Sequence, residues 1–172
     1  AACRARCRRG SALSMTGEVG ALIDELAARG VFRATPLETG SAEAAAWRLT
    51  WFGGHQMRLQ VGAGLVHVDD LLPPLPAQSS IYRDLRAWLK AQQAQDLPAH
   101  RRLDPRCFAL AVRNSRGQIR LSLGSDQEPL PALTNRAVQL VNALYHDFLG
   151  GLGRLEWVIE AFGLDPDNPR LS

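Results

Sequence analysis

The stretch WRLTWFGGHQMRLQVGAGLVHV, residues 47–68, decides the fold of this 172-residue chain. Apolar side chains take every second position in three successive runs, at 47–51, 57–61 and 66–68, and polar side chains stand between them. This alternation is typical of antiparallel strands that turn one face to a core and the other to water. The stretch therefore predicts a three-stranded antiparallel meander.

Glycines set the expected registers of the meander. A three-residue loop with a glycine bulge at 52–54 places Leu49 opposite Met57 and keeps the apolar side chains of both strands on one face. A two-residue type II′ turn at 62–63 puts glycine first, where that turn favours it, and places Met57 opposite Val68. A slip by one residue would turn a whole apolar set towards water.

Outside the meander, periodic apolar residues predict four helices and a second hairpin. The helices are expected at 17–29, from 79 or 80 to about 89, at 132–149 and at 152–162. The hairpin strands are expected at 108–112 and 119–123, with a type I turn at 114–117. A loop is expected at 33–45 and a glycine hinge at 150–153. This order predicts an α+β fold, in which an antiparallel sheet of about five strands packs against helices that lie largely on one side.

The positive charges of the chain are concentrated at its start. The formal net charge is +3 and the pI about 9.1, but residues 1–14 hold four arginines and no acid, so residues 15–172 are close to −1. We expect 1–14 to be a disordered basic tail and 15–172 to be a single domain. Met15 is interpreted as the natural initiator; a nucleic-acid-binding arm and a cloning or targeting remnant are the alternatives for the tail.

No motif brings together the groups that catalysis or metal binding requires. The pair Asp69-Asp70 lies on a strand, where neighbours point to opposite faces, and the four histidines lack partners at ligand spacing. Nucleophile elbows and phosphate-binding loops are missing from the sequence, and Cys107 is expected to be a buried strand thiol. We therefore expect no catalytic, cofactor or metal site, and not an enzyme. No apolar run has the length of a membrane helix, so a cytoplasmic location is expected.

The segment between the second helix and the second hairpin is basic. It carries Lys90, Arg101, Arg102 and Arg106 against two aspartates. Single-strand binders interleave such residues with aromatic stacking platforms, and residues 89–107 contain no aromatic residue. Direct nucleic-acid binding through this linker and the tail is therefore the alternative function, not the first.

Large apolar side chains in the meander and the second helix are the candidates for binding a partner, since tryptophan and tyrosine dominate interface hot spots. Plain core packing is the competing interpretation, and it requires all of the tryptophans concerned to be buried. We expect at least one of them to be partly exposed. The candidate partner-binding residues are Trp47, Trp51, Met57 and Leu59, and the candidate homodimer interface is Tyr82, Leu85, Trp88 and Leu89.

The second half of the chain carries a family resemblance. The strand CFALAV at 107–112 runs on to Gly117, the return strand covers 119–123, and a long helix covers 133–149. Together with the order of elements before them, these stretches resemble the YbjN-like bacterial proteins and, in topology, the type III secretion chaperones. The resemblance implies a non-catalytic homodimer that holds a partner protein. The fourth helix at 152–162 and the arginine-rich start depart from the pattern. The sequence shows no secretion context, so a cytosolic regulator or scaffold is expected rather than a chaperone of secreted effectors.

Overall fold

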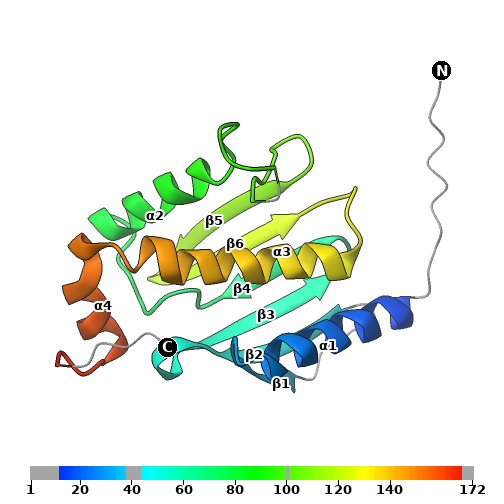
Figure 1. Cartoon of the computed structure of the whole chain (residues 1–172), viewed down its shortest axis with the longest axis horizontal. Coiled ribbons are helices and arrows are strands. Elements are labelled where there is room, and N and C mark those ends of the chain that lie inside the picture. Colours follow the sequence, from blue (N-terminus) through cyan, green and yellow to red (C-terminus); the bar gives the residue numbers. More distant parts are fainter. Residues whose placement is uncertain (1–11, 38–43, 100, 168–172) are drawn as a thin grey trace.

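The computed structural model describes residues 12–37, 44–99 and 101–167 (Figure 1). The elements in chain order are α1 (Ala12–Ala28), β1 (Arg33–Leu37), β2 (Ala44–Thr50), β3 (Gln56–Gly62), β4 (Leu65–Asp69), α2 (Ser80–Ala91), β5 (Ala109–Ser115), β6 (Gln118–Gly124), α3 (Leu130–Ala143) and α4 (Leu155–Phe162). A π-helical segment, Leu144–Phe148, continues α3. Residues 1–11 lie outside the described part, so the expected disorder of the tail stays a prediction.

The strands form one antiparallel sheet in the order β1-β2-β3-β4-β6-β5. The α+β class and the antiparallel sheet are confirmed. The prediction of about five strands was one short, because β1 lies in the segment expected to be a loop. Its sequence Arg-Ala-Thr-Pro-Leu has no alternating apolar pattern, and it is held extended by pairing with β2. Local sequence is a weak guide where pairing decides the conformation.

The first helix begins earlier than the sequence suggested. The expected start at residue 17 rested on Thr16 as a cap, and the predicted tail extended to residue 14. In the structure α1 begins at Ala12, five residues before the expected start. Alanine, leucine and methionine are strong helix formers, and they carry the helix back across residues 12–15.

The register between β2 and β3 is confirmed. Leu49 lies opposite Met57 and Trp47 opposite Leu59. The N–H of Trp51 donates to the carbonyl of His55 at 2.8 Å, which closes the three-residue loop Phe52–Gly54. The apolar side chains of both strands therefore lie on one face, as the alternation predicted.

Both of the tight turns differ from prediction. The turn between β3 and β4 uses Ala63 and Gly64, both at positive φ, so Leu59 rather than Met57 lies opposite Val68. The turn between β5 and β6 uses Arg116 and Gly117, also at positive φ, in place of a type I turn over 114–117. Two consecutive residues at positive φ make a type I′ turn, whose twist matches that of the flanking strands. The first correction shifts the register by two residues and leaves the faces unchanged.

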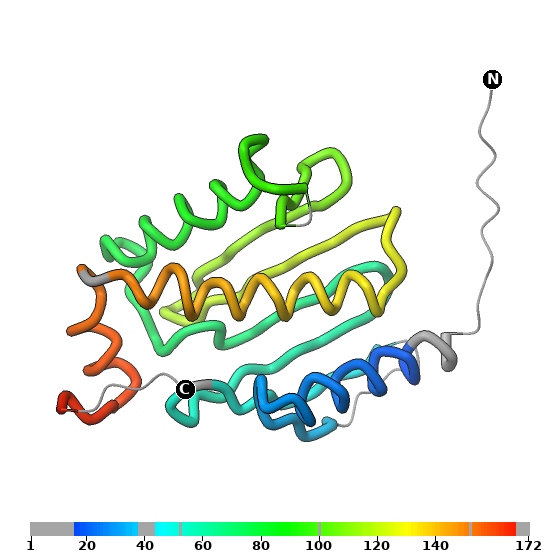
Figure 2. Tube along the Cα trace, in the orientation of Figure 1, coloured from blue at the N-terminus to red at the C-terminus, as the bar shows by residue number. Residues whose placement is uncertain are grey.

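α1, α2 and α3 lie on one side of the sheet, and the core lies between these helices and the sheet; α4 lies at one end of the sheet (Figure 2). α3 packs across β3, β4 and β6, and α1 packs against α3 and β1. α2 lies along the β5 side of this layer (Figure 1). The opposite face of the sheet carries the polar members of the alternation. None of the helices in the described part of the chain combines the length and apolar composition that crossing a bilayer requires.

Candidate functional site

The four residues expected to bind a partner are part of the core. Trp47, Trp51, Met57 and Leu59 are between 0% and 7% exposed. Trp47, Met57 and Leu59 point from their strands towards the helices. Trp51 follows β2, and its ring centroid lies 5.1 Å from that of Phe32 and 5.9 Å from that of Tyr145. Core packing is therefore the correct interpretation of Trp47 and Trp51. A partner would reach these four side chains only if the helices left the sheet.

The four residues expected at a homodimer interface divide unequally. Tyr82, Leu85 and Leu89 are buried on the face of α2 that packs inward. Trp88 alone is half-buried, and its ring lies 6.0 Å from that of Phe148. The expectation that one of the tryptophans would be partly exposed is thus met by Trp88. An amphipathic stripe shows which residues share a helix face, but it does not show whether that face contacts the core or a partner. Three of these four residues contact the core.

A surface groove runs between α2 and β5, and the sequence did not indicate it. Its volume is about 410 Å³, and its floor includes Leu110 and Val112 of β5 and Leu89 of α2. Leu110 and Val112 point to the helix side of the sheet, yet they are only half-buried. α3 covers β3, β4 and β6, so β5 depends on α2 for its cover, and α2 leaves part of it open.

The rim of the groove is basic. Arg83, Arg86 and Lys90 line it from α2, spaced so that they follow one side of the helix, and each is exposed. Arg83 lies 3.9 Å from Asp84. In the described part of the chain, neither Arg86 nor Lys90 makes an ion pair. The groove therefore combines an apolar floor with uncompensated positive charge on one wall.

The strand that borders the groove is also a free edge of the sheet. β1, at the other edge, has five residues and contains Pro36, which cannot donate to another strand. β5 has seven residues and no proline. Proline and short length are the usual protection of an edge strand against pairing with another chain. β5 lacks both.

The hairpin geometry defines which backbone groups of β5 are free. Ser115 and Gln118 flank a two-residue turn and form a hydrogen-bonded pair, so hydrogen-bonded and non-hydrogen-bonded pairs alternate from there. This alternation turns the N–H and C=O groups of Leu110 and Val112 away from β6. The opposite strand agrees, because the carbonyl of Ile119 accepts from Leu71 on the side away from β5. Within the described residues, no backbone hydrogen bond fills this edge from 109 to 113.

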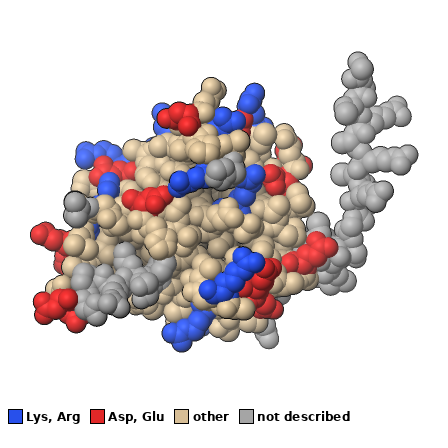
Figure 3. All heavy atoms as spheres, viewed as in Figure 1, with Lys and Arg blue, Asp and Glu red and all other residues tan. Residues whose placement is uncertain are grey.

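The helix-free face of the sheet is strongly basic. Register places Arg48, Arg58, Asp69, Arg120 and Arg113 in one row across β2, β3, β4, β6 and β5. Arg120 binds Asp69 in a two-point ion pair, in which one contact is 3.1 Å long, and this bond raises the pKa of Arg120. On the helix-covered face, by contrast, acidic and basic side chains are interspersed (Figure 3).

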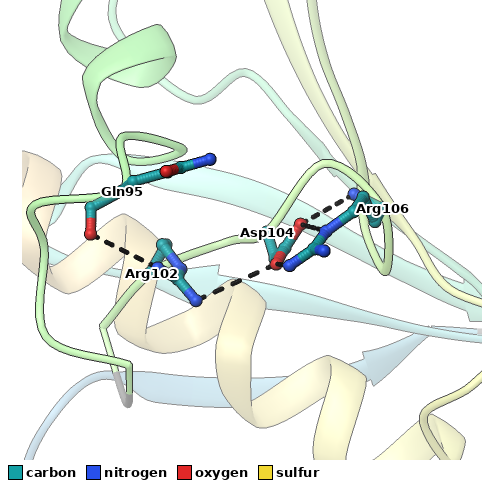
Figure 4. Close-up of polar contacts among 4 residues, drawn as sticks. All are labelled: Gln95, Arg102, Asp104 and Arg106. Carbon is teal, nitrogen blue, oxygen red and sulfur yellow. Dashed lines mark hydrogen bonds and ion pairs between the residues drawn. The ribbon is translucent and has the colours of Figure 1, made fainter.

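The linker arginines that suggested nucleic-acid binding are neutralised by acids. Arg106 binds Asp104 at 2.7 and 3.1 Å, and Arg102 lies 3.9 Å from the same carboxylate (Figure 4). The hydrogen bonds from Arg106 hold the pKa of Asp104 well below its usual range. Arg101 pairs with Asp147 of the π-helical segment at 3.0 Å. These contacts organise the linker and leave little of its charge for a ligand.

His55, His67 and Cys107 are in ordinary structural surroundings. The ring of His55 donates from Nε2 to the carbonyl of Asp70 at 2.6 Å, and His67 Nδ1 lies 2.8 Å from the Ser122 hydroxyl on the helix-free face. Burial lowers the pKa of both histidines. Cys107 is half-buried against the core. Across the described residues, no group of three histidine, cysteine or acidic side chains is placed to hold a metal ion.

No protein-family model matches this chain. A search of curated proteins gives no match either. The candidate site therefore rests on geometry: a basic-rimmed apolar groove, a free strand edge beside it and an arginine row on the helix-free face of the sheet.

Proposed function

We propose that this protein is a non-catalytic protein-binding module whose binding site is the groove between α2 and β5. The observation that carries the proposal is the unprotected edge of β5, with Leu110 and Val112 half-exposed beneath α2. An extended segment of a partner would pair with the free N–H and C=O groups of β5. Its alternate side chains would enter the groove. Strand addition of this kind gains affinity from the backbone and specificity from the pockets.

The proposal includes the resemblance to YbjN-like proteins and to the fold of type III secretion chaperones. The order of elements supports it: α1, a meander β2–β4, α2, a hairpin β5–β6 and α3. β1 and α4 are additions to that order. On this basis we propose a bacterial, cytoplasmic, regulatory protein that acts as a homodimer without cofactors.

Nucleic-acid binding is the second candidate, and the helix-free face is the observation that favours it. Five arginines, Arg33, Arg48, Arg58, Arg113 and Arg120, lie on that face among the described strand residues, with Asp69 as the single acid. Arginine suits phosphate because its guanidinium binds two oxygens at once. Against this candidate, none of the described strand residues on that face is a phenylalanine, tyrosine or tryptophan, so bases would lack the usual stacking platform.

The test compares the full chain with variants that block one surface at a time. Val112→Pro removes an outward N–H without touching the bonds to β6, and Ala87→Arg fills the groove from α2. Arg48→Glu alters the helix-free face far from β5. Affinity-tagged proteins are used to capture partners from a lysate of the source organism, with and without nuclease, and circular dichroism confirms that each variant folds.

The proposal requires proteins that are captured by the unaltered chain and by Arg48→Glu but lost with Val112→Pro and Ala87→Arg, regardless of nuclease. Capture that is unaffected by both groove variants would disprove the groove as the binding site. Capture that is lost with Arg48→Glu or with nuclease would instead support the nucleic-acid candidate.

A further inference from the structure

We propose that the segment bound at β5 is an acidic strand of alternating pattern, with carboxylates on the side of the helix-free face and apolar side chains on the side of the groove. This inference rests on the proposed function and specifies the chemistry of the partner. It joins two observations that lie on opposite faces of the sheet: the arginine row and the basic-rimmed groove.

The arginine row contains two like-charged pairs directly across neighbouring strands. Arg48 lies opposite Arg58, and Arg113 lies opposite Arg120. Directly opposite like charges destabilise a sheet. Asp69 lies between Arg58 and Arg120, and its negative charge compensates positive charge in the middle of the row. At the β5 end, Arg113 is exposed and makes no ion pair with any described residue.

A seventh strand would extend the row by one position. Its residue opposite Arg113 would point to the same face, with the Cβ atoms about 5 Å apart. A glutamate there would pair with Arg113 and offset its repulsion from Arg120. The alternation of strand side chains would place the next carboxylate beside Ala111, two positions along, on the same face.

The intervening residues of the added strand would face the groove. There they would meet Leu110 and Val112, whose apolar surface is only half-covered. The positive rim, Arg83, Arg86 and Lys90, would stand over the strand from α2. A negatively charged segment therefore meets complementary charge on both sides of β5 and apolar surface in the groove.

A second copy of this chain fits the same edge less well. Pairing β5 with β5 about a two-fold axis would bring Arg83, Arg86 and Lys90 of both protomers to one interface. It would also supply arginine but no carboxylate on the helix-free face, because the charged residue of β5 is Arg113. Charge therefore favours an acidic partner.

The experiment uses fluorescent capped peptides of the same length as β5, with valine alternating with either glutamate or lysine. Binding to the full chain is measured by fluorescence anisotropy at low and high salt. We expect the glutamate peptide to bind, more weakly as salt rises, and the lysine peptide to bind at least about fivefold more weakly.

Four variants show which contacts are responsible for the binding. Arg113→Glu is expected to weaken binding of the glutamate peptide by about fivefold and to strengthen binding of the lysine peptide. Arg48→Glu is the matched control at the far end of the row and should leave both affinities unchanged. Val112→Pro should weaken binding of the glutamate peptide by about threefold to tenfold, because a hydrogen bond is lost. Ala87→Arg should also weaken binding of this peptide.

The failures of the two proposals are distinguishable. Equal binding of both peptides, with loss in Val112→Pro, would overturn the acidic pattern and leave strand addition in place. Binding of neither peptide, together with partner capture that is insensitive to Val112→Pro and Ala87→Arg, would overturn both proposals. A change in the mass of the particle by light scattering in Val112→Pro would show that the edge is occupied by a second copy.

Discussion

At the scale of residues, Tyr145 connects three parts of the molecule. Its ring is buried on the π-helical segment, and its hydroxyl donates to the carbonyl of Leu71 at 3.0 Å. The N–H of Leu71 donates in turn to the carbonyl of Ile119 in β6. Leu71 belongs to the segment that leaves β4 for α2, so this chain of bonds fixes the crossing segment between sheet and helix layer.

We expect Tyr145→Phe to lower the free energy of unfolding by about 1–2 kcal/mol, because the variant leaves a buried carbonyl without this donor. Chemical denaturation should show a lower midpoint with an unchanged slope. Tyr82→Phe is the control, since Tyr82 is also a buried helical tyrosine but donates no such hydroxyl bond among the described contacts. Equal losses in the two variants would contradict the role of the bond.

The half-buried His55 predicts a dependence of stability on pH. Burial holds its folded-state pKa below the ordinary value of 6.5, and the Phe162 ring lies 5.5 Å from it, edge-on. The unfolded chain therefore takes up a proton more readily, so the contribution of His55 to stability is present above about pH 6.5 and is lost as the pH falls. The denaturation midpoint should drop between pH 7.5 and 5.5, and less so in His55→Gln. An equal drop in that variant would assign the effect to other groups, among them His67.

Residue-scale predictions from sequence succeeded for faces and failed for exposure. Alternation correctly placed Trp47, Leu49, Met57 and Leu59 on one side of the sheet. It carries no information on how many helices will cover that side, so three of these residues, Trp47, Met57 and Leu59, were proposed to contact a partner. The half-exposed Leu110 and Val112 follow the same pattern as buried strands and gave no separate signal.

At the scale of elements, the glycines after α3 predict a further effect on stability. A Cβ on Gly150 would lie 2.3 Å from the carbonyl oxygen of His146, which is too close for two non-bonded atoms. A Cβ on Gly153 would meet nothing within 4 Å. We expect Gly150→Ala to cost about 1–3 kcal/mol and Gly153→Ala to be near neutral. Thermal unfolding of the two variants checks this. Similar melting temperatures would show that the turn relaxes without cost.

Elements with strong periodicity were the ones that sequence placed well. α2 is nearly where its apolar stripe predicted, and Ser79 caps it by accepting from the N–H of Tyr82 at 3.2 Å. β1 escaped prediction because its pairing, not its composition, makes it a strand. The two tight turns were misassigned because moving a turn by one residue along the chain shifts the register by two and keeps the same parity of apolar residues. The groove depends on the distance between α2 and β5, which no local pattern encodes.

At the scale of the whole molecule, we expect a homodimer, with Trp88 as the one large aromatic of the predicted interface that is still partly accessible. Light scattering of the full chain should give about twice 18.8 kDa at micromolar concentration. A Trp88→Ala variant should shift the particle towards the monomer while circular dichroism stays unchanged. A particle of 18.8 kDa at high micromolar concentration would contradict the prediction.

The sheet is assembled from two locally connected pieces that meet at one seam. The meander β1–β4 and the hairpin β5–β6 each form from neighbours in sequence, and they join only where β4 pairs with β6. Contacts across the seam link distant residues, for example His67 with Ser122 and Asp69 with Arg120. Closing so long a loop is slow compared with making a hairpin. The seam should therefore form late in folding, and the continuous arginine row exists only after it closes. A chain still emerging from the ribosome can offer a strand edge, but the full charged surface belongs to the completed fold.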